Sequence, residues 1–369
     1  MNQTYEQNFT EVIDPIATAA HVTWSLTALI GIPANLFVLA AIVYFRDMRT
    51  ISNIYIFNLA LADLLFLCAI PVTFFGRSMR EGWRWGPIMC KLYISGNAVS
   101  QFASAVFIAI LSFDRYLAVC RPIQSKSFRT TQAAVILSIA AWAMVIIEMT
   151  PLFLFVKLIK TTTGGHTTRS CMLFVGNVTA LETLDESIPD VAVLNEVEQN
   201  MLTSRRFFIS YTFALSYLIP LVAVWFFYFK IILKMCQQKQ QMQTKRTGTK
   251  RRTAKVTIMG LAIVISYTHC WLPFWIVQWS IEANLFQNSK YLLFVFTHFA
   301  FALQYINSAA NPFLYVFLSD SFQKNMQKLL RTAKPDKQIS LKSTTEPLDT
   351  TRMITVTANP MCSTAFDSC

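Results

Sequence analysis

The sequence predicts an all-α membrane protein, a seven-transmembrane helix bundle followed by a short amphipathic eighth helix. Three observations support this fold class. Hydrophobic residues make up 54% of the 369 residues and charged residues only 14%, which is too apolar for an ordinary soluble domain. Seven separate apolar segments reach the roughly 20 residues that a helix needs to cross a bilayer. After the seventh, FQKNMQKLLR places apolar and basic residues on opposite helix faces.

The apolar segments also set the domain boundaries. They lie at roughly 22–45, 53–75, 89–120, 131–156, 207–234, 255–281 and 290–317. We therefore expect an extracellular tail over residues 1–21, a transmembrane bundle over 22–317, a membrane-surface helix over 318–331 and a disordered cytoplasmic tail over 332–369. The first residues lack the basic start and short apolar run of a cleaved signal peptide, so the first span is expected to serve as its own insertion signal.

The positions of the basic residues predict which loops are cytoplasmic. Lys and Arg cluster after the first and third spans, between the fifth and sixth, and after the seventh. The positive-inside rule places these segments in the cytoplasm with the C-terminus, and the N-terminus outside the plasma membrane. Nine Lys or Arg residues lie between Lys230 and Lys255. Because this run adjoins two spans, topology and anionic membrane lipids explain the net charge of +12 better than nucleic-acid binding does.

Five motifs fall in separate predicted spans. They are Asn58-Leu59-Ala60-Leu61-Ala62-Asp63, Asp114-Arg115-Tyr116, Trp142, Cys270-Trp271-Leu272-Pro273 and Asn311-Pro312-Phe313-Leu314-Tyr315. In this order and at these spacings the set resembles the rhodopsin-like family of G-protein-coupled receptors, over roughly residues 20–335. The resemblance implies a signal-transducing receptor and not an enzyme. It also implies a heterotrimeric G protein, receptor kinases and arrestin as partners, with an allosteric sodium ion in place of any organic cofactor.

The resemblance places the activation machinery in the inner half of the bundle. The residues expected to act in G-protein coupling and activation are Asp114, Arg115, Tyr116, Tyr228, Pro273, Asn311, Pro312 and Tyr315. No acid occurs near Thr253, where some family members pair one with the arginine of the third helix, so Arg115 is expected to be restrained by Asp114. Ala105 and Tyr267 also depart from the family pattern, being smaller and larger than usual, and their volumes are expected to compensate.

Asp63 is a carboxylate in the middle of a predicted span. Such a group costs about 2.5–3.5 kcal/mol on insertion, so it must face the bundle interior. The resemblance implies that Asp63, Ser104, Asn307 and Ser308 form an oxygen-lined sodium site; the alternative is a neutral Asp63, hydrogen-bonded for packing. Gly31 and Asn35 share one face of the first span, where Gly31 allows close helix approach and Asn35 is expected to hydrogen-bond toward Asp63.

Asn97 bears most directly on the ligand. Asn97, Gln101 and Ser104 lie on one face of the third span. In the amine, somatostatin and opioid receptors the position matching Asn97 is an aspartate that pairs with a ligand cation. An amide cannot neutralise a desolvated ammonium, so Asn97 argues against an amine ligand and puts in doubt a peptide whose key contact is a buried lysine. The pocket residues implied by position are Asn97, Gln101, Trp271, Phe274, Gln278, Gln304 and Tyr305.

Three stretches most resemble the somatostatin, allatostatin-C and opioid receptors. They are SFDRYLAVCRPI, CWLPFWIVQ and YINSAANPFLYVFLSDSFQK. The resemblance implies a receptor for an extracellular neuropeptide that signals mainly through inhibitory Gi/o proteins, and the missing aspartate favours the allatostatin-C-like branch. A receptor for another peptide, such as an opioid-like or galanin-like one, and an orphan receptor are the alternatives.

Several features belong to the predicted outer face. Cys90 and Cys171 both lie there and can form a bridge from the second outer loop to the third helix, while the cysteines in cytoplasmic or membrane regions are not expected to pair. Asn2, Asn8 and Asn177 begin glycosylation tripeptides. Between Ser170 and Ser204 the second outer loop carries six acids and no Lys or Arg. This loop is either a solvated acidic face or an electrostatic funnel for a basic peptide, and the two are compatible.

Other functional classes fit the sequence poorly. A retinal-binding light sensor needs a lysine where Tyr305 stands. A transporter would be favoured by internal repeats and matching broken helices, and the sequence shows neither. An intramembrane enzyme would need a paired nucleophile and base or a set of metal ligands, whereas the four histidines are scattered along the chain, at His21, His166, His269 and His298.

Overall fold

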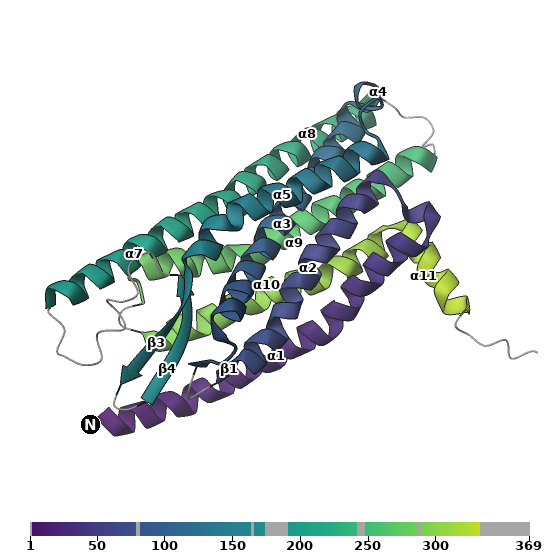
Figure 1. The fold of residues 1–369 in the computed structure, drawn as a ribbon. Coiled ribbons are helices and arrows are strands. Elements are labelled where there is room, and N and C mark those ends of the chain that lie inside the picture. The colour runs from purple at the N-terminus through teal and green to yellow at the C-terminus, as the bar shows by residue number, and fades with distance from the viewer. Residues whose placement is uncertain are drawn as a thin grey trace, which may run out of the picture. The chain divides into compact units, whose positions relative to one another are not determined.

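In the computed structural model, long helices pack side by side and a strand hairpin covers one end of them (Figure 1). The structure describes residues 2–78, 82–163, 166–173, 191–241, 248–286 and 289–332. The bundle belongs to one compact unit that ends at Lys328. Its long helices are α1 (Asn2–Tyr44), α2 (Ile51–Gly76), α3 (Gly86–Cys120), α5 (Thr131–Phe155), α7 (Val191–Phe213), α8 (Ile219–Gln241), α9 (Gly248–Glu282) and α10 (Lys290–Leu318).

Seven of these stretches are long and apolar enough to cross a membrane. They are Pro15–Tyr44, Ile51–Phe75, Gly86–Cys120, Thr131–Phe155, Arg205–Gln237, Thr257–Glu282 and Tyr291–Leu318. The fifth comprises α7, the π-helical turn η3 (Ala214–Leu218) and α8. The predicted seven-helix fold is therefore confirmed, although the first helix begins well before residue 22.

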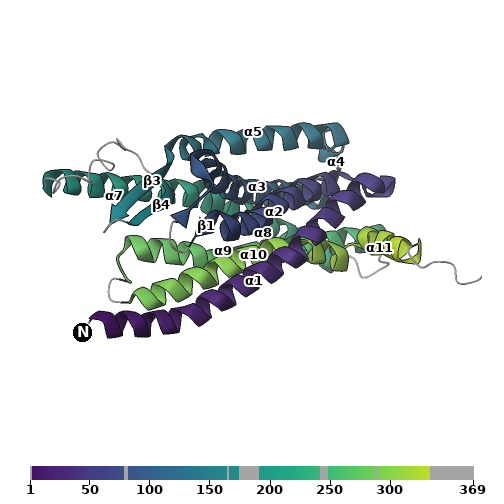
Figure 2. The same ribbon diagram turned by 60° about the horizontal axis from the view of Figure 1, so that its bottom comes forward.

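Helix α3 occupies the centre of the bundle. It packs against α2, α5, α8 and α9, while α1 packs against α2 and α10. Figure 2 shows α5 and α1 at opposite edges, with α2 and α3 between them. Leu29, Ile136 and Ile147 are exposed on outward faces. Exposed apolar residues of this kind suit a lipid surround, in which the polar groups instead turn inward.

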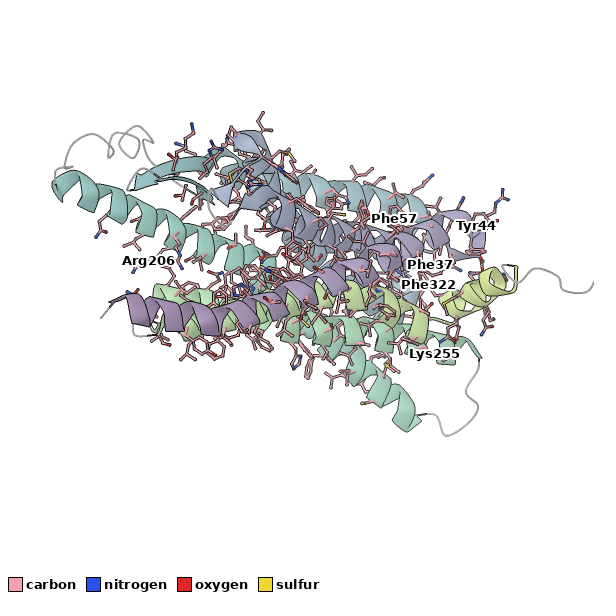
Figure 3. The ribbon with its side chains drawn as sticks, turned by 90° about the horizontal axis from the view of Figure 1, so that it is seen from below. Phe37, Tyr44, Phe57, Arg206, Lys255 and Phe322 are labelled. Carbon is pink, nitrogen blue, oxygen red and sulfur yellow. A yellow bond between two sulfur atoms is a disulfide. The ribbon has the colours of Figure 1, made fainter. Side chains whose placement is uncertain are left out.

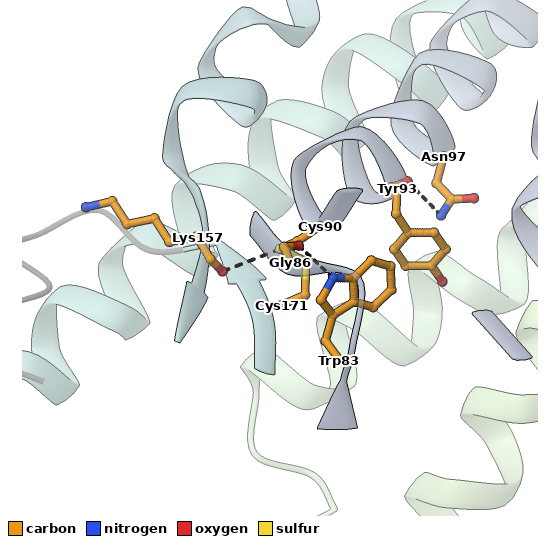
Figure 4. The surroundings of a disulfide bond; sticks show 7 residues. All are labelled: Trp83, Gly86, Cys90, Tyr93, Asn97, Lys157 and Cys171. Atoms are coloured by element: carbon orange, nitrogen blue, oxygen red, sulfur yellow. Dashed lines mark hydrogen bonds between the residues drawn. A yellow bond between two sulfur atoms is a disulfide. The ribbon is translucent and has the colours of Figure 1, made fainter. Parts of the chain in front are cut away.

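The outer end carries a four-stranded sheet in the order β1-β2-β4-β3. Its strands are β1 (Arg77–Ser78), β2 (Gly82–Trp83), β3 (Val156–Thr163) and β4 (His166–Leu173). The hairpin of β3 and β4 pairs Leu158 with Cys171, and Cys171 forms a disulfide with Cys90 at the start of α3 (Figure 4). The predicted bridge between the second outer loop and the third helix is therefore confirmed.

The inner end carries the short connections and the amphipathic helix α11 (Asp320–Thr332). Lys255 of α9 forms an ion pair with Asp320 at 2.5 Å, and Asn325 donates a hydrogen bond to the carboxylate of Asp47 at 3.2 Å. Phe322 is buried while Lys324 is exposed, which confirms the predicted amphipathic eighth helix. Figure 3 places Lys255 and Phe322 at the end of the bundle opposite Arg206.

The disulfide predicts a large effect of Cys171→Ser. The bridge holds the hairpin over α3, and losing such a bridge costs about 2–4 kcal/mol. We expect markedly reduced surface expression and a lowered melting temperature of the solubilised protein. Cys68→Ser, which removes an exposed free cysteine, is the matched control. Equal behaviour of the two variants would show that the hairpin does not need the bridge.

Candidate functional site

Trp271 lies in an aromatic cluster that joins α2, α9 and α10. Its ring centroid is 5.9 Å from that of Phe66 and 6.3 Å from that of Phe274, and Phe66 lies 4.9 Å from Tyr305. These are the separations of attractive ring pairs. The structure thus brings three predicted pocket residues together and adds Phe66, whose role sequence reasoning missed.

Asn97 and Gln101 lie one turn apart on α3 but bond in different directions. The Asn97 amide donates to the carbonyl of Tyr93 at 3.1 Å (Figure 4), and its own oxygen is buried without a partner. Gln101 instead donates across the bundle to the Ser216 hydroxyl at 2.8 Å. Asn97 therefore keeps a free acceptor, whereas Gln101 ties α3 to the fifth span.

Gln304 and Gln278 differ in their surroundings. Gln304 is buried, and its amide nitrogen has no hydrogen-bond partner. Gln278 is half-buried, and no hydrogen bond in the described structure joins it to the other predicted pocket residues. The indole N–H of Trp271 is likewise buried and unpaired. A buried donor without an acceptor costs about 1–3 kcal/mol, so Gln304 and Trp271 are each able to donate a hydrogen bond to a further group.

The π-helical turn η3 connects the pocket to α9. Pro220 has no N–H to donate to the carbonyl of Ser216, four residues before it. The Tyr267 hydroxyl donates to that carbonyl at 2.6 Å, and the Tyr217 hydroxyl donates to the carbonyl of Thr268 at 3.1 Å. Two cross-helix bonds therefore join η3 and α9. The tyrosine at 267, unusual for the family, has a specific hydrogen-bonding role.

Asp63 is fully buried at the centre of the bundle. Asn311 donates to its Oδ2 at 2.8 Å, while Oδ1 has no hydrogen-bond partner. The hydroxyls of Ser104 and Ser308 face this carboxylate, but only the Asn311 contact has hydrogen-bond geometry. A buried carboxylate oxygen without a donor, beside two hydroxyls and a further unpaired amide oxygen on Asn311, fits a hard cation such as sodium.

Asn35 and Asn307 make hydrogen bonds near Asp63 that the sequence did not predict. Asn35 does not bond toward Asp63: its amide donates to the carbonyls of Gly31 and Ser308, at 3.0 and 3.1 Å. Asn307 accepts a bond from Ser266 of α9 at 3.0 Å. Both outcomes follow from helix packing. A Cβ on Gly31 would lie 2.8 Å from the Cβ of Ala309, so α1 and α10 approach closely and the main chain of α10 comes within reach of Asn35.

Asp114 forms a network at the inner end. It accepts from Arg115 at 2.6 Å, from Arg129 at 2.9 Å and from Ser52 at 3.3 Å. The expected restraint of Arg115 by Asp114 is present, and Arg129 is a partner that sequence reasoning missed. Arg129 lies nine residues beyond the end of α3, and the sequence gave no signal for the contact because the short helix α4 (Pro122–Ser125) folds the chain back.

The side chain of Tyr228 in α8 is buried against Gly260 of α9. A Cβ added to Gly260 would overlap the phenolic oxygen of Tyr228 and come within 3.9 Å of Arg115. The hydroxyls of Tyr228 and Tyr315 are both buried without hydrogen-bond partners. Tyr116 lies further out, with its ring 5.6 Å from Phe227. The structure thus gathers Arg115 and Tyr228 around Gly260, a position that sequence analysis did not single out.

Glu148 is a further residue that sequence analysis missed. It is half-buried in α5, its Oε2 is buried without a hydrogen-bond partner, and it is the one charged residue in the span Thr131–Phe155. An ionisable residue inside a span is by default a functional candidate, so this signal was visible in the sequence.

Some predicted features cannot be placed. Asn177, the acids between Glu182 and Asp190, and the tail beyond Thr332 lie outside the described residues. Asn2 and Asn8 fall within α1, and Thr253 within α9. Their proposed roles stay predictions.

The fold and these clusters define a seven-span helical membrane protein with an aromatic cluster around Trp271 and an arginine network around Asp114. The chain matches the model of the 7 transmembrane receptor (rhodopsin family) over residues 34–315. It therefore belongs to this family, which is one of signalling receptors and not of enzymes, and it is a multi-pass membrane protein.

Several curated proteins are similar over most of the chain. Somatostatin receptor type 1 of Rattus norvegicus is 30% identical over 310 residues, covering 83% of this chain and 70% of the relative. Somatostatin receptor type 4 of Rattus norvegicus is 29% identical, covering 86% and 75%. Somatostatin receptor type 2 of Sus scrofa is 30% identical, covering 84% and 76%.

The η3 network predicts that Tyr267→Phe destabilises the bundle. The substitution keeps the ring but removes the bond to the Ser216 carbonyl, at a cost of about 1 kcal/mol. We expect the melting temperature of the solubilised receptor to fall by about 2–4 °C. Tyr291→Phe, at the exposed start of α10, controls for loss of a tyrosine hydroxyl. An unchanged melting temperature for Tyr267→Phe would mean that the bond does not contribute.

Proposed function

We propose that this chain is a receptor for an extracellular neuropeptide of the somatostatin and allatostatin-C type, coupled mainly to inhibitory Gi/o proteins. The observation that carries the proposal is the similarity to three somatostatin receptors across more than four fifths of the chain. The outer pocket supports it. Unpaired polar groups on Asn97, Gln304 and Trp271 suit the amide groups of a peptide.

The proposed mechanism is a shift between two arrangements of the bundle. A peptide in the outer pocket contacts the aromatic cluster around Trp271. The bonds between η3 and α9 then transmit the change, and α9 bends at Pro273, which interrupts its hydrogen-bond ladder. Arg115 leaves Asp114 and meets the G protein beside Tyr228 and Tyr315.

A sodium ion is proposed as an allosteric cofactor at Asp63. When bound, it would offset the charge of the buried carboxylate and favour the inactive arrangement. Asp63 is the anionic ligand, and Ser104 and Ser308 supply hydroxyl oxygens. Asn307 is the weaker member of the predicted set because its side-chain oxygen accepts from Ser266, whereas Asn311 bonds Asp63 directly.

The proposed location is the plasma membrane, with the N-terminus outside and the C-terminus in the cytoplasm. In this orientation the basic sequence from Lys230 to Lys255 and the amphipathic helix α11 would be on the side of the inner leaflet. Receptor kinases and arrestin are proposed partners of the polar C-terminal tail, whose phosphorylation would add negative charge.

The test is Gi/o activation in cells that express the chain, screened against allatostatin-C-like, somatostatin-like and opioid-like peptides. We expect at least one of the first two classes to activate it. Asn97→Asp should weaken that response, because it buries a carboxylate in a site that has no matching cation. Asn97→Gln, which keeps the amide, controls for the change of shape.

If neither Asn97→Asp nor Asn97→Gln weakens the response, Asn97 does not take part in ligand binding. Activation by opioid-like peptides alone would overturn the subfamily assignment. If no peptide activates the chain, the proposed ligand class is wrong, while the membership of the receptor family still holds.

Basal signalling gives a separate prediction for Asp114. The Asp114→Asn substitution removes the charge that holds Arg115 and Arg129 together, so both guanidiniums are released. We expect basal GTPγS binding in membranes to rise several-fold, since a charge pair this buried is worth about 3–5 kcal/mol when broken. Arg121→Gln, which alters an exposed arginine bonded to Gln124, should leave basal binding unchanged. No rise for Asp114→Asn would show that the network does not restrain Arg115.

A further inference from the structure

The seven spans contain four carboxylates, and they differ in whether they have partners. Three have at least one side-chain partner in the bundle, although Oδ1 of Asp63 has none. For Glu148 the described structure gives neither a side-chain hydrogen bond nor an ion pair. The three acids with side-chain partners are Asp63 with Asn311, Asp114 with Arg115 and Arg129, and Glu282 with Arg205 and Arg206.

The surroundings of Glu148 place it on a seam between three helices. The Tyr211 hydroxyl of α7 donates to the backbone carbonyl of Glu148 at 2.7 Å. The ring of Tyr211 lies 6.3 Å from Phe102 of α3. Phe102 directly follows Gln101, one of the predicted pocket residues. Glu148 thus lies where α5 meets α7, with α3 on the other side of the Tyr211 ring.

The orientation of α5 separates Glu148 from the lipid-facing side. Val145, Met149 and Leu152 are buried against the bundle, and Glu148 lies beside this face at helical spacing. Ile147 points the other way and is 71% exposed. One oxygen of Glu148 is inaccessible within the bundle, so the side chain borders the packed seam.

Three basic residues near the same end of the helices have partners of their own. Lys91 at the start of α3 lies over the ring of Phe153, 5.3 Å from its centroid. Arg205 and Arg206 both pair with Glu282. A carboxylate on a low-dielectric seam with no internal partner is costly, and a cation from outside the described bundle would offset this cost.

We propose that Glu148 is the anionic anchor for a cationic group of the peptide ligand, an amine or guanidinium that enters the seam between α5, α7 and α3. The proposal rests on the proposed function as a peptide receptor. The proposal places a cation-binding carboxylate in the outer half of the bundle, on a helix that packs against the helix of Asn97. The doubt that Asn97 cast on peptides with a buried lysine therefore applies to position 97 and not to the whole pocket.

The first experiment asks whether position 148 is reached by water. Cells expressing Glu148→Cys are treated from outside with a membrane-impermeant cationic methanethiosulfonate, which reacts with hydrated thiolates. We expect labelling above that of the parent chain, and protection by the activating peptide. Ile147→Cys, one residue along on the exposed face, should not react because lipid suppresses thiolate formation. Failure of Glu148→Cys to react would overturn the proposal without reference to any ligand.

The second experiment pairs Glu148→Gln with a change in the peptide. The peptide that activates the parent chain is made in native form and with its amines and guanidiniums neutralised, by norleucine, citrulline and N-acetylation. Breaking a desolvated charge pair should cost the native peptide at least about 30-fold in potency on Glu148→Gln. The neutralised peptide should lose less than about 3-fold, because it cannot form the pair. Equal losses for both peptides would reduce Glu148 to a structural role and overturn the proposal.

The two experiments separate this proposal from the function on which it rests. If no peptide activates or binds the parent chain, the proposed function fails and the anchor fails with it. If a peptide activates the chain normally but Glu148→Gln leaves its potency unchanged, only the anchor is wrong.

Discussion

Lipid offers no hydrogen bonds to the seven spans, so every polar group inside them depends on a partner within the bundle. This constraint explains why the buried polar residues form cross-helix contacts. Trp142 of α5 donates to Asn58 of α2 at 2.8 Å, and Asn311 of α10 donates to Asp63 of α2. Each contact fixes the rotation of one helix about another. Apolar side chains can slide past one another, whereas a buried hydrogen bond has a defined distance and direction.

The same constraint explains the hydrogen bonds between helices near Pro220. Pro220 cannot supply the N–H that the Ser216 carbonyl would receive in a regular helix, and the chain widens into η3 at this point. Tyr267 of α9 donates to the carbonyl, while Gln101 of α3 donates to the side chain of the same serine. A single residue thus receives bonds from two helices. Movement of α9 cannot leave η3 and α3 unaffected, which gives the proposed ligand pocket a physical link to the helix proposed to move.

The fold was predictable because its signals are local. Segment length, hydropathy and basic flanks identify each span without knowledge of its neighbours. The partners of individual polar groups were predicted less well, because they depend on how closely two helices approach. Asn35 was expected to reach Asp63, but Gly31 brings α10 close enough for the main chain of Ser308 to accept instead. Glu148 was visible as an acid in an apolar segment, yet only the packed structure reveals that it lacks a partner.

Unpaired buried polar groups occur at several places in the bundle, two of them near its opposite ends, although most buried groups in folded proteins are paired. Around the outer pocket they belong to Asn97, Trp271 and Gln304, and near Arg115 they belong to its own Nε and to Tyr228. The folded state would be more stable if these groups had hydrogen-bond partners or were replaced by apolar groups. Their retention at two opposed sites fits a receptor whose bonding is completed by other molecules, by a peptide on one side and by a G protein on the other.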